Sequence, residues 1–249
     1  MPATPSWPPR SAPRLFVSQQ LEAGAPITLT GNPAHYLSRV MRVAAGDTII
    51  LCDNQTGEWA ARVTFVGKRE VESTAMQHLR PREQVPDLWL CPALLKRDRF
   101  DLMLEKATEL GAARVQPVVT RRCVADKLNL ERASMIVTEA AEQCARTALP
   151  EMADPVKLDR LLGEWPDNRT MFFADEAGGE AAAKVFARTK GPAALLTGPE
   201  GGFDDVERAA IRALPQARAI SLGPRILRGE TATIAATALW MALAGDWQH

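Results

Sequence analysis

The chain has 249 residues, of which 46% are hydrophobic and 24% charged, as in a globular protein that buries a substantial core. Its 30 basic and 30 acidic residues give a formal net charge of zero, which argues against a protein that coats nucleic acid through bulk electrostatics. We predict free thiols and no structural metal, because the cysteines are scattered and the histidines have no ligand spacing. These residues are Cys52, Cys91, Cys123, Cys144, His35, His78 and His249.

The first 13 residues, MPATPSWPPRSAP, contain no apolar period and are predicted to form a flexible leader. No continuous apolar run follows the starting Met, so we do not expect a secretory signal. The most apolar segment, residues 234–244, is about half as long as a membrane span and indicates a buried helix. We therefore expect a cytoplasmic protein without a membrane segment.

Residues 14–79 contain short, strand-like segments separated by Gly, Asn and Pro, with one short helix expected over residues 35–43. The strand-like segments are RLFV, PITL, DTIILCD, EWAARVTFVG and ESTAMQHL. Several short strands in so small a region predict a small β-barrel. Residues 80–87, RPREQVPD, are predicted to be a linker.

Residues 88–249 show a different pattern, in which apolar strands alternate with longer helical segments. Strands are expected at 88–94, 115–119, 170–174, 193–197 and 217–221, and helices at 99–110, 130–148, 204–213 and 231–244. Fully apolar strands that alternate with helices predict an α/β domain with a parallel sheet covered on both faces.

A glycine-rich turn, Gly198-Pro199-Glu200-Gly201-Gly202, follows the strand expected at 193–197. Ligands collect beyond the carboxyl ends of parallel strands, and glycine lets the backbone approach a ligand closely. A tight connection without a ligand explains the same residues. The turn lacks the Lys and Ser/Thr of a Walker loop, and Glu200 would repel a phosphate, so any ligand is expected to be neutral or cationic.

A second turn of this kind, LGPRILRGETA from Leu222 to Ala232, leads from the strand at 217–221 into the last helix. Two such turns at adjacent strand ends could enclose one pocket. Arg225 and Arg228 are then substrate or phosphate contacts, or else surface charges paired with nearby acids.

Together, LLTGPEGGFDDVE and SLGPRILRGETA resemble the signature pair of the RsmE family, SPOUT-class methyltransferases that modify N3 of a uridine in 16S ribosomal RNA. Residues 95–122 resemble the family's K-x-x-R and K-x-x-E-L-G segment, and residues 139–146 resemble its E-Q-x-x-R helix. The resemblance covers most of residues 94–232. The small N-terminal barrel agrees with the PUA-like domain of this family.

The resemblance implies a trefoil-knotted methyltransferase domain, in which the knot holds S-adenosylmethionine. This ligand carries two cationic groups, so it tolerates an acidic turn. The positions that match the family's cofactor site are Leu196, Thr197, Gly198, Pro199, Glu200, Gly201, Gly202, Ile220, Ser221, Leu222, Gly223, Arg225, Ile226, Leu227, Arg228, Thr231 and Ala232.

Attack by uridine N3 requires loss of its proton, after which negative charge spreads onto O2 and O4. Arg228 is our first candidate for stabilising that charge and Arg225 the second. Glu200 and Glu230 are candidates for taking the proton. Either carboxylate could instead cap a helix N-terminus, and for Glu230 the sequence favours that interpretation.

The resemblance also implies a homodimer and a small ribosomal subunit or its 16S RNA as substrate. Arg14, Arg39, Arg42, Lys96, Arg99, Arg121 and Arg122 are the candidate phosphate contacts. Two alternatives stay open: a related SPOUT enzyme that modifies another base or transfer RNA, and a non-catalytic RNA-binding assembly factor.

Overall fold

The structure is a computed structural model that describes residues 8–9 and 11–248. Its contacts divide the chain into two compact units. The first consists of the chain up to Gln84 together with Ala141–Ala148, and the second of Val85–Ala140 together with the chain from Leu149 onward. The predicted leader, residues 1–13, lies mostly outside the described residues. The domain boundaries inferred from the sequence stay a prediction. The structure groups residues 141–148 with the first unit, which the sequence did not indicate.

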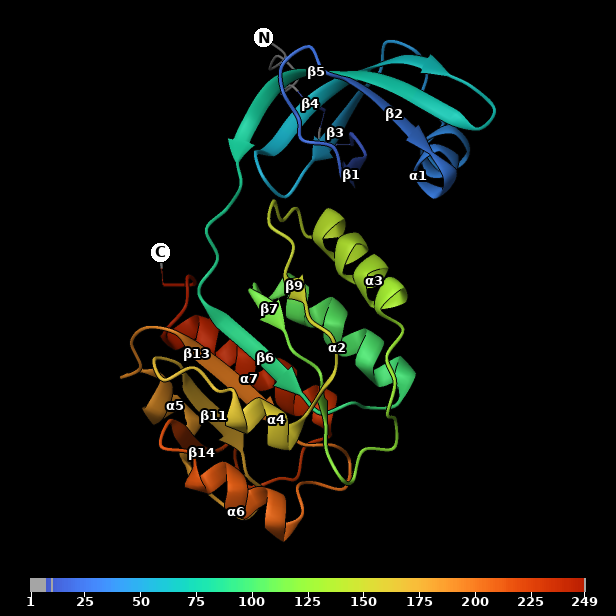
Figure 1. Ribbon diagram of the computed structural model, residues 1–249. Coiled ribbons are helices and arrows are strands. Elements are labelled where there is room, and N and C mark those ends of the chain that lie inside the picture. Colours follow the sequence, from blue (N-terminus) through green and yellow to red (C-terminus); the bar gives the residue numbers. More distant parts are fainter. Residues whose placement is uncertain (1–7, 10, 249) are drawn as a thin grey trace. The chain divides into compact units, whose positions relative to one another are not determined.

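The first unit is a five-stranded sheet (Figure 1) with the strand order β1-β3-β4-β5-β2. Its elements are β1 (Arg14–Phe16), β2 (Pro26–Thr30), α1 (Gly31–His35), the π-helix η1 (Tyr36–Val40), β3 (Thr48–Cys52), β4 (Gly57–Val66) and β5 (Glu70–Pro81). β1 and β3 are parallel, whereas the other pairs are antiparallel. The predicted small barrel thus takes the form of a sheet with β1 and β2 at its edges.

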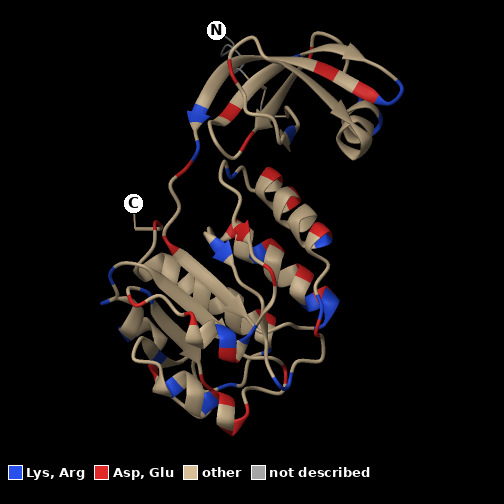
Figure 2. Cartoon of the chain, viewed as in Figure 1, with Lys and Arg blue, Asp and Glu red and all other residues tan. Residues whose placement is uncertain are grey.

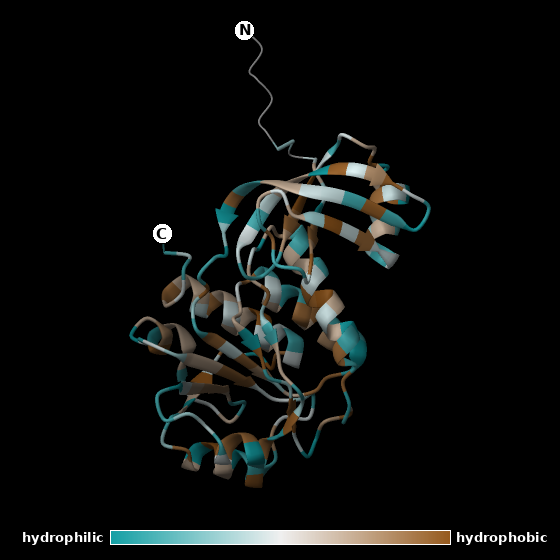
Figure 3. Ribbon diagram, turned by 45° about the horizontal axis from the view of Figure 1, so that its top comes forward, coloured by the Kyte–Doolittle hydropathy of each residue, from teal (hydrophilic) through white to brown (hydrophobic). Residues whose placement is uncertain are grey.

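Alternation of apolar and polar residues builds this sheet. Figure 3 shows hydrophobic and hydrophilic bands that alternate along its strands. In β2, for example, Ile27 and Leu29 are buried whereas their neighbours are exposed, because successive side chains of a strand point to opposite faces. One core, which includes Leu37, Ile49 and Val71, fills the buried face.

The predicted helix at 35–43 is displaced towards the N-terminus. α1 begins at Gly31, and the π-helix η1 follows it and ends at Val40. Arg42 then has a φ of 55°, in the left-handed region, which prevents the helix from continuing to Val43.

The second unit is a seven-stranded sheet with the order β12-β14-β11-β13-β6-β7-β9, and all of its pairs are parallel. Its strands are β6 (Leu88–Pro92), β7 (Arg114–Val115), β9 (Glu151–Met152), β11 (Thr170–Ala174), β12 (Glu180–Ala181), β13 (Ala193–Thr197) and β14 (Ala217–Ser221). A separate parallel pair consists of β8 (Val118–Val119) and β10 (Val156–Lys157). The prediction of a parallel α/β sheet is confirmed.

Helices cover both faces of this sheet (Figure 1). The helices are α2 (Arg97–Glu109), α3 (Leu130–Gln143), α4 (Leu158–Gly163), α5 (Ala182–Phe186), α6 (Asp205–Ala213) and α7 (Gly229–Leu243). In β13, Leu195 joins the core beneath α2, α5 and α7, while Leu196 joins the core beneath α4 and α6. This two-sided burial explains why β13 is apolar throughout.

Two elements of the second unit differ from the sequence-based prediction. The strand expected at 115–119 is split into β7 and β8 on either side of Gln116 and Pro117, and Pro117 cannot donate a hydrogen bond to a neighbouring strand. The helix expected to reach residue 148 ends at Gln143, shortly before Ala145 adopts a φ of 62°.

The apolar last helix is explained within the chain itself. α7 packs against α2 and α5, and its side chains Ala236, Trp240 and Met241 are buried in the core of the second unit. Its composition therefore does not by itself require a second subunit, and the helix is buried, as the sequence indicated. No helix among the described residues is long and apolar enough to cross a bilayer.

Candidate functional site

The candidate site lies at the carboxyl ends of β11, β13 and β14, which are neighbours in the sheet. Three loops that follow these strands line one pocket, as expected where ligands bind parallel α/β sheets. We call them the 175–178 loop, the 198–204 loop and the 222–228 loop. The predicted meeting of the two Gly-Pro turns in one pocket agrees with this arrangement.

Most of the predicted cofactor residues line this pocket. They are Gly198, Pro199, Glu200, Gly202, Ile220, Ser221, Leu222, Gly223, Arg225, Ile226, Leu227 and Ala232. Leu196, Thr197, Gly201, Arg228 and Thr231 are not among the lining residues that the structure describes. Leu196 and Thr197 are buried beneath the loop as the end of β13, and the hydroxyl of Thr197 lies 2.7 Å from that of Thr233.

The sequence reasoning missed the 175–178 loop, which contributes Asp175, Glu176 and Gly178 to the pocket. It also missed Ala174, Phe203, Arg208, Pro224 and Gly229. A signal was present, since Asp-Glu-Ala-Gly-Gly directly follows a predicted apolar strand. The strand order, in which β11 lies between β13 and β14, is visible only in the structure.

Asp175 anchors its loop to α6. Its carboxylate is buried and accepts hydrogen bonds from Arg208 Nε at 3.0 Å and from Arg212 Nη2 at 2.7 Å. Burial alone would raise the pKa of Asp175, but the hydrogen bonds from Arg212, the Ala177 amide and Arg208 outweigh it and hold the pKa below its usual value. The carboxylate thus fixes the loop as an anion.

The 198–204 loop ends in a capping box that begins α6. The Asp204 carboxylate accepts from the Glu207 amide at 2.7 Å, and the Glu207 carboxylate accepts from the Asp204 amide at 3.1 Å. The first of these bonds, helped by Arg121, holds the pKa of Asp204 below its usual value despite some desolvation. Asp204 therefore caps α6, a role for which the sequence had also made Glu200 a candidate.

Glycine is favoured at Gly202, where φ is +65°. A Cβ added to this residue would lie 2.7 Å from Oε1 of Glu176, so the backbone of one loop passes directly beside the carboxylate of another. Such a close approach cannot be made by any other residue without displacing Glu176.

The two candidate base residues share one arginine. Arg99 Nη1 lies 3.1 Å from Glu200 Oε1, and Arg99 Nε lies 3.9 Å from Glu230 Oε1. Glu200 lines the pocket, whereas Glu230 is buried in the first turn of α7 and is not among the described residues that line the pocket. The N-cap of α7 is Arg228, so Glu230 does not cap this helix.

The candidate arginines of the 222–228 loop separate in the structure. Both Arg225 and Arg228 are exposed, but only Arg225 is among the described residues that line the pocket. The order of preference from the sequence, Arg228 before Arg225, is therefore not the one that the geometry favours.

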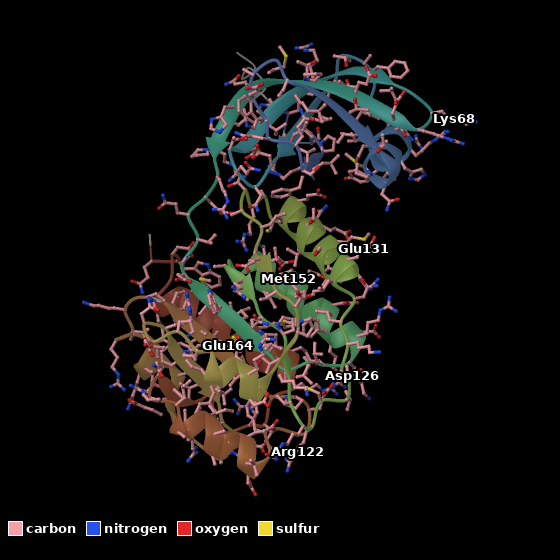
Figure 4. All side chains as sticks on the ribbon, in the orientation of Figure 1. Lys68, Arg122, Asp126, Glu131, Met152 and Glu164 are labelled. Atoms are coloured by element: carbon pink, nitrogen blue, oxygen red, sulfur yellow. The ribbon has the colours of Figure 1, made fainter. Side chains whose placement is uncertain are left out.

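Besides Arg99, which contacts Glu200 and Glu230, the candidate phosphate contacts fall into two groups. Arg39, Arg42 and Lys96 are exposed. Arg14 forms an ion pair with Glu58, Arg121 pairs with Asp204 at 3.2 Å, and Arg122 donates to the carbonyl of Gly201 at 2.8 Å. Arg122, labelled in Figure 4, thus tethers the 198–204 loop.

Further basic residues that the sequence reasoning missed lie in the turn between β4 and β5. Figure 2 shows this turn in the colour of Lys and Arg, and Lys68 is labelled there in Figure 4. Lys68 and Arg69 lie in this turn, just before β5 begins at Glu70. Glu70 pairs with Thr30, the residue before α1, so the turn lies close to α1. Lys68 and Arg69 therefore extend the basic positions near α1 and η1.

No group of three or more His, Cys, Asp or Glu residues in the described part of the chain is arranged to hold a metal ion. The pocket combines the carboxylates of Asp175, Glu176 and Glu200 and the guanidinium groups of Arg208 and Arg225 with apolar walls from Phe203 and Leu222. Such a site suits a partly apolar ligand that carries charged groups.

Comparisons with known proteins agree with this description. Residues 81–241 match the model of an RNA methyltransferase domain, and residues 29–75 match that of an RNA methyltransferase PUA domain. The fold together with these two matches therefore defines an RNA methyltransferase with a PUA domain.

Individual relatives identify the family. The chain is 32% identical to ribosomal RNA small subunit methyltransferase E of Synechocystis, over 92% of this chain and 77% of the relative. It is 30% identical to the protein of the same name from Bacillus subtilis, over 88% of this chain and 91% of the relative. The crystal structure of a ribosomal RNA small subunit methyltransferase E from Neisseria gonorrhoeae bound to S-adenosyl methionine has a TM-score of 0.88 and 28% identity, and covers 95% of this chain and 99% of that chain. The chain belongs to the ribosomal RNA small subunit methyltransferase E family, which confirms the RsmE resemblance.

Proposed function

We propose that this enzyme uses S-adenosylmethionine to methylate N3 of a uridine in 16S ribosomal RNA. The observation that carries the proposal is the pocket at the ends of β11, β13 and β14, built from glycine-rich loops and lined by carboxylates. A structure of a relative from Neisseria gonorrhoeae, 28% identical, contains this cofactor.

The residues of the pocket fit the cofactor. Its sulfonium and ammonium groups are cations, which the carboxylates of Glu176 and Glu200 would attract. Ile220, Leu222 and Phe203 offer apolar walls for an adenine ring, and the loop at Gly202 lets backbone approach the ligand. When bound, the cofactor supplies an electrophilic methyl group.

Arg225 is our preferred residue for stabilising the negative charge that develops on O2 and O4 of the uridine, because it is exposed and lines the pocket. Glu200 is our preferred residue for accepting the N3 proton, since it lines the pocket whereas Glu230 is buried and is not among the described lining residues. Substitutions of Arg228 and Glu230 test whether Arg225 and Glu200 are the residues that act.

Two experiments test the function. RNA hydrolysate from a strain without this protein should lack N3-methyluridine in its 16S RNA, and complementation should restore it. Single-turnover methylation should slow in Arg225→Ala and Glu200→Gln more than in Arg228→Ala and Glu230→Gln. Near-wild-type rates in all four variants contradict the assigned roles, and loss of a different modified base points to another RNA substrate.

Three further properties follow from the family resemblance and form part of the proposal. The first is a trefoil knot around the pocket, supported by the meeting of the 198–204 and 222–228 loops although β11 separates their strands. The others are a cytoplasmic location and a homodimer. For the dimer, the exposed apolar side chains Leu102 and Met135 are compatible contacts, and light scattering at micromolar concentration tests it.

A further inference from the structure

Three segments that are distant in the sequence bring charged side chains together at the edge of the pocket. Arg99 comes from the first turn of α2, Glu200 from the 198–204 loop and Glu230 from the first turn of α7. The guanidinium of Arg99 lies within 4 Å of both carboxylates, at 3.1 Å from Glu200 and 3.9 Å from Glu230. One cation therefore faces two anions.

Glu230 needs this cation because it is buried. Its side chain is 9% exposed, and its Oε2 atom has no hydrogen-bond partner among the described residues. A buried carboxylate that loses its counter-ion carries the full cost of desolvation. The attraction of Glu230 therefore holds the Arg99 guanidinium in place. In this position the guanidinium also pairs with the Glu200 carboxylate.

Other arginines hold the 198–204 loop through different atoms. Arg122 donates to the carbonyl of Gly201, and Arg121 pairs with Asp204. Among the contacts of the described residues, it is Arg99 that reaches the Glu200 carboxylate. The contacts of Arg121 and Arg122 therefore hold the loop, whereas the contact of Arg99 orients the Glu200 side chain.

We propose that Arg99 is a positioning residue of the pocket, whose guanidinium, anchored on the buried Glu230, holds the Glu200 carboxylate at the pocket edge. The inference rests on the proposed use of S-adenosylmethionine. It replaces the prediction from the sequence that Arg99 contacts an RNA phosphate, because its side chain is only 30% exposed and already faces two carboxylates.

The test is a double-mutant cycle on cofactor affinity, measured by calorimetry with S-adenosylmethionine and no RNA. Arg99→Met and Glu200→Gln are each expected to raise the Kd about tenfold, the size of a coupling of about 1.4 kcal/mol. The double variant Arg99→Met/Glu200→Gln should bind no more weakly than Glu200→Gln alone. Arg99→Lys should recover part of the affinity, because it restores the charge without the fork of the guanidinium.

Two variants keep this test interpretable. Arg97→Met removes a cation of the same helix that pairs with Asp101 and contacts neither glutamate, so its Kd should equal that of the wild type. If Arg99→Met fails to fold because Glu230 is left uncompensated, Arg99→Met/Glu230→Gln removes that charge and allows the same comparison.

The outcomes separate this inference from the proposed function. A wild-type protein that does not bind S-adenosylmethionine contradicts the proposed function itself. With a binding wild type, the positioning role is overturned if Glu200→Gln leaves the Kd unchanged, or if the Arg99→Met loss persists undiminished in the Glu200→Gln background. A change in the salt dependence of RNA binding without a change in cofactor Kd would return Arg99 to the role of a phosphate contact.

Discussion

The carboxylate of Asp175 accepts a hydrogen bond from Arg208 Nε at 3.0 Å, and this pair joins the 175–178 loop to α6. Arg208 also contacts Glu176 and Asp205 and donates to the carbonyl of Phe203, so one guanidinium connects two walls of the pocket. The shape of the pocket thus depends on an ion pair that no motif in the sequence marks.

Asp175→Asn should destabilise the protein by about 2 to 3 kcal/mol at neutral pH, the usual effect of removing a charged acceptor from buried hydrogen bonds. The folded pKa of Asp175 is lowered, so its stabilising contribution is complete above the unfolded pKa of about 3.9 and is lost as pH falls through the folded value. The difference between wild type and variant in urea unfolding should therefore shrink below about pH 4.

Asp205→Asn is the matched control for this prediction. Asp205 pairs with the same arginine, Arg208, at 3.1 Å, but its side chain is 99% exposed. Its replacement should cost far less stability, because exposed ion pairs contribute little. Equal losses in the two variants would mean that burial does not govern the Asp175 interaction.

A buried pair of hydroxyl groups supports the start of the 198–204 loop. Thr233 Oγ1 donates to the carbonyl of Gly229 at 2.9 Å, so Thr197 must be the donor in the 2.7 Å contact between the two threonines. Thr233→Val strands the Thr197 proton in the core and should cost about 2 kcal/mol. Thr197→Val leaves Thr233 bonded to Gly229 and should cost less.

Chemical denaturation of the two single variants and of Thr197→Val/Thr233→Val measures this effect. The double variant should recover part of the Thr233→Val loss, because the stranded donor is gone. Strictly additive losses would contradict the assignment of donor and acceptor.

Gly202→Ala should weaken binding of S-adenosylmethionine, because the new Cβ displaces the Glu176 carboxylate that lines the pocket. It should also lower stability, since a left-handed φ costs L-residues about 1 to 2 kcal/mol. Gly223→Ala tests the strain alone, because its φ is +112° but a Cβ added there would have no atom within 4 Å. It should have a smaller effect. Calorimetric Kd values provide the comparison.

Gly191→Ala controls for a general loss of stability. Gly191 has a φ of +83°, no neighbour within 4 Å of an added Cβ and no place among the pocket residues. It should lower the melting temperature without changing the Kd. If Gly191→Ala weakens cofactor binding as much as Gly202→Ala, the contact with Glu176 has no specific role.

Much of the fold could be predicted because burial on both faces leaves a simple pattern in the sequence. The strands at 170–174, 193–197 and 217–221 were predicted with their observed bounds. The first two are short apolar runs buried on both faces, whereas in the third, ARAIS, only Ile220 is buried. The division of 114–119 into two strands was missed, because β7 and β8 pair with different partner strands, which the local sequence does not show.

The candidate site was only partly predictable for a related reason. Glycine-rich turns after apolar strands are visible locally, and they indicated the loops around Gly202 and Gly223. The 175–178 loop and the triad of Arg99, Glu200 and Glu230 depend on strand order and helix packing, which bring together residues more than 20 positions apart. Spacing along the chain does not encode such contacts.

Arg42 combines a strained backbone with an exposed charge, which indicates a role outside folding. Its φ of 55° lies in the left-handed region and costs a non-glycine residue about 1 to 2 kcal/mol. Arg42→Gly should therefore leave the melting temperature unchanged or raise it, while binding of a 16S RNA fragment weakens. Loss of one phosphate contact should reduce the slope of log K against log salt by about one unit.

Arg39→Ala is the comparison that separates the two effects of this substitution. Arg39 is also exposed but lies within η1 and is not among the residues with positive φ. Its replacement should reduce RNA affinity and the salt slope in the same way, without any gain in stability. If both variants keep the wild-type slope, the surface near η1 does not bind phosphates; if Arg42→Gly alone melts at a lower temperature, the left-handed backbone there is not strained enough to be relieved by glycine.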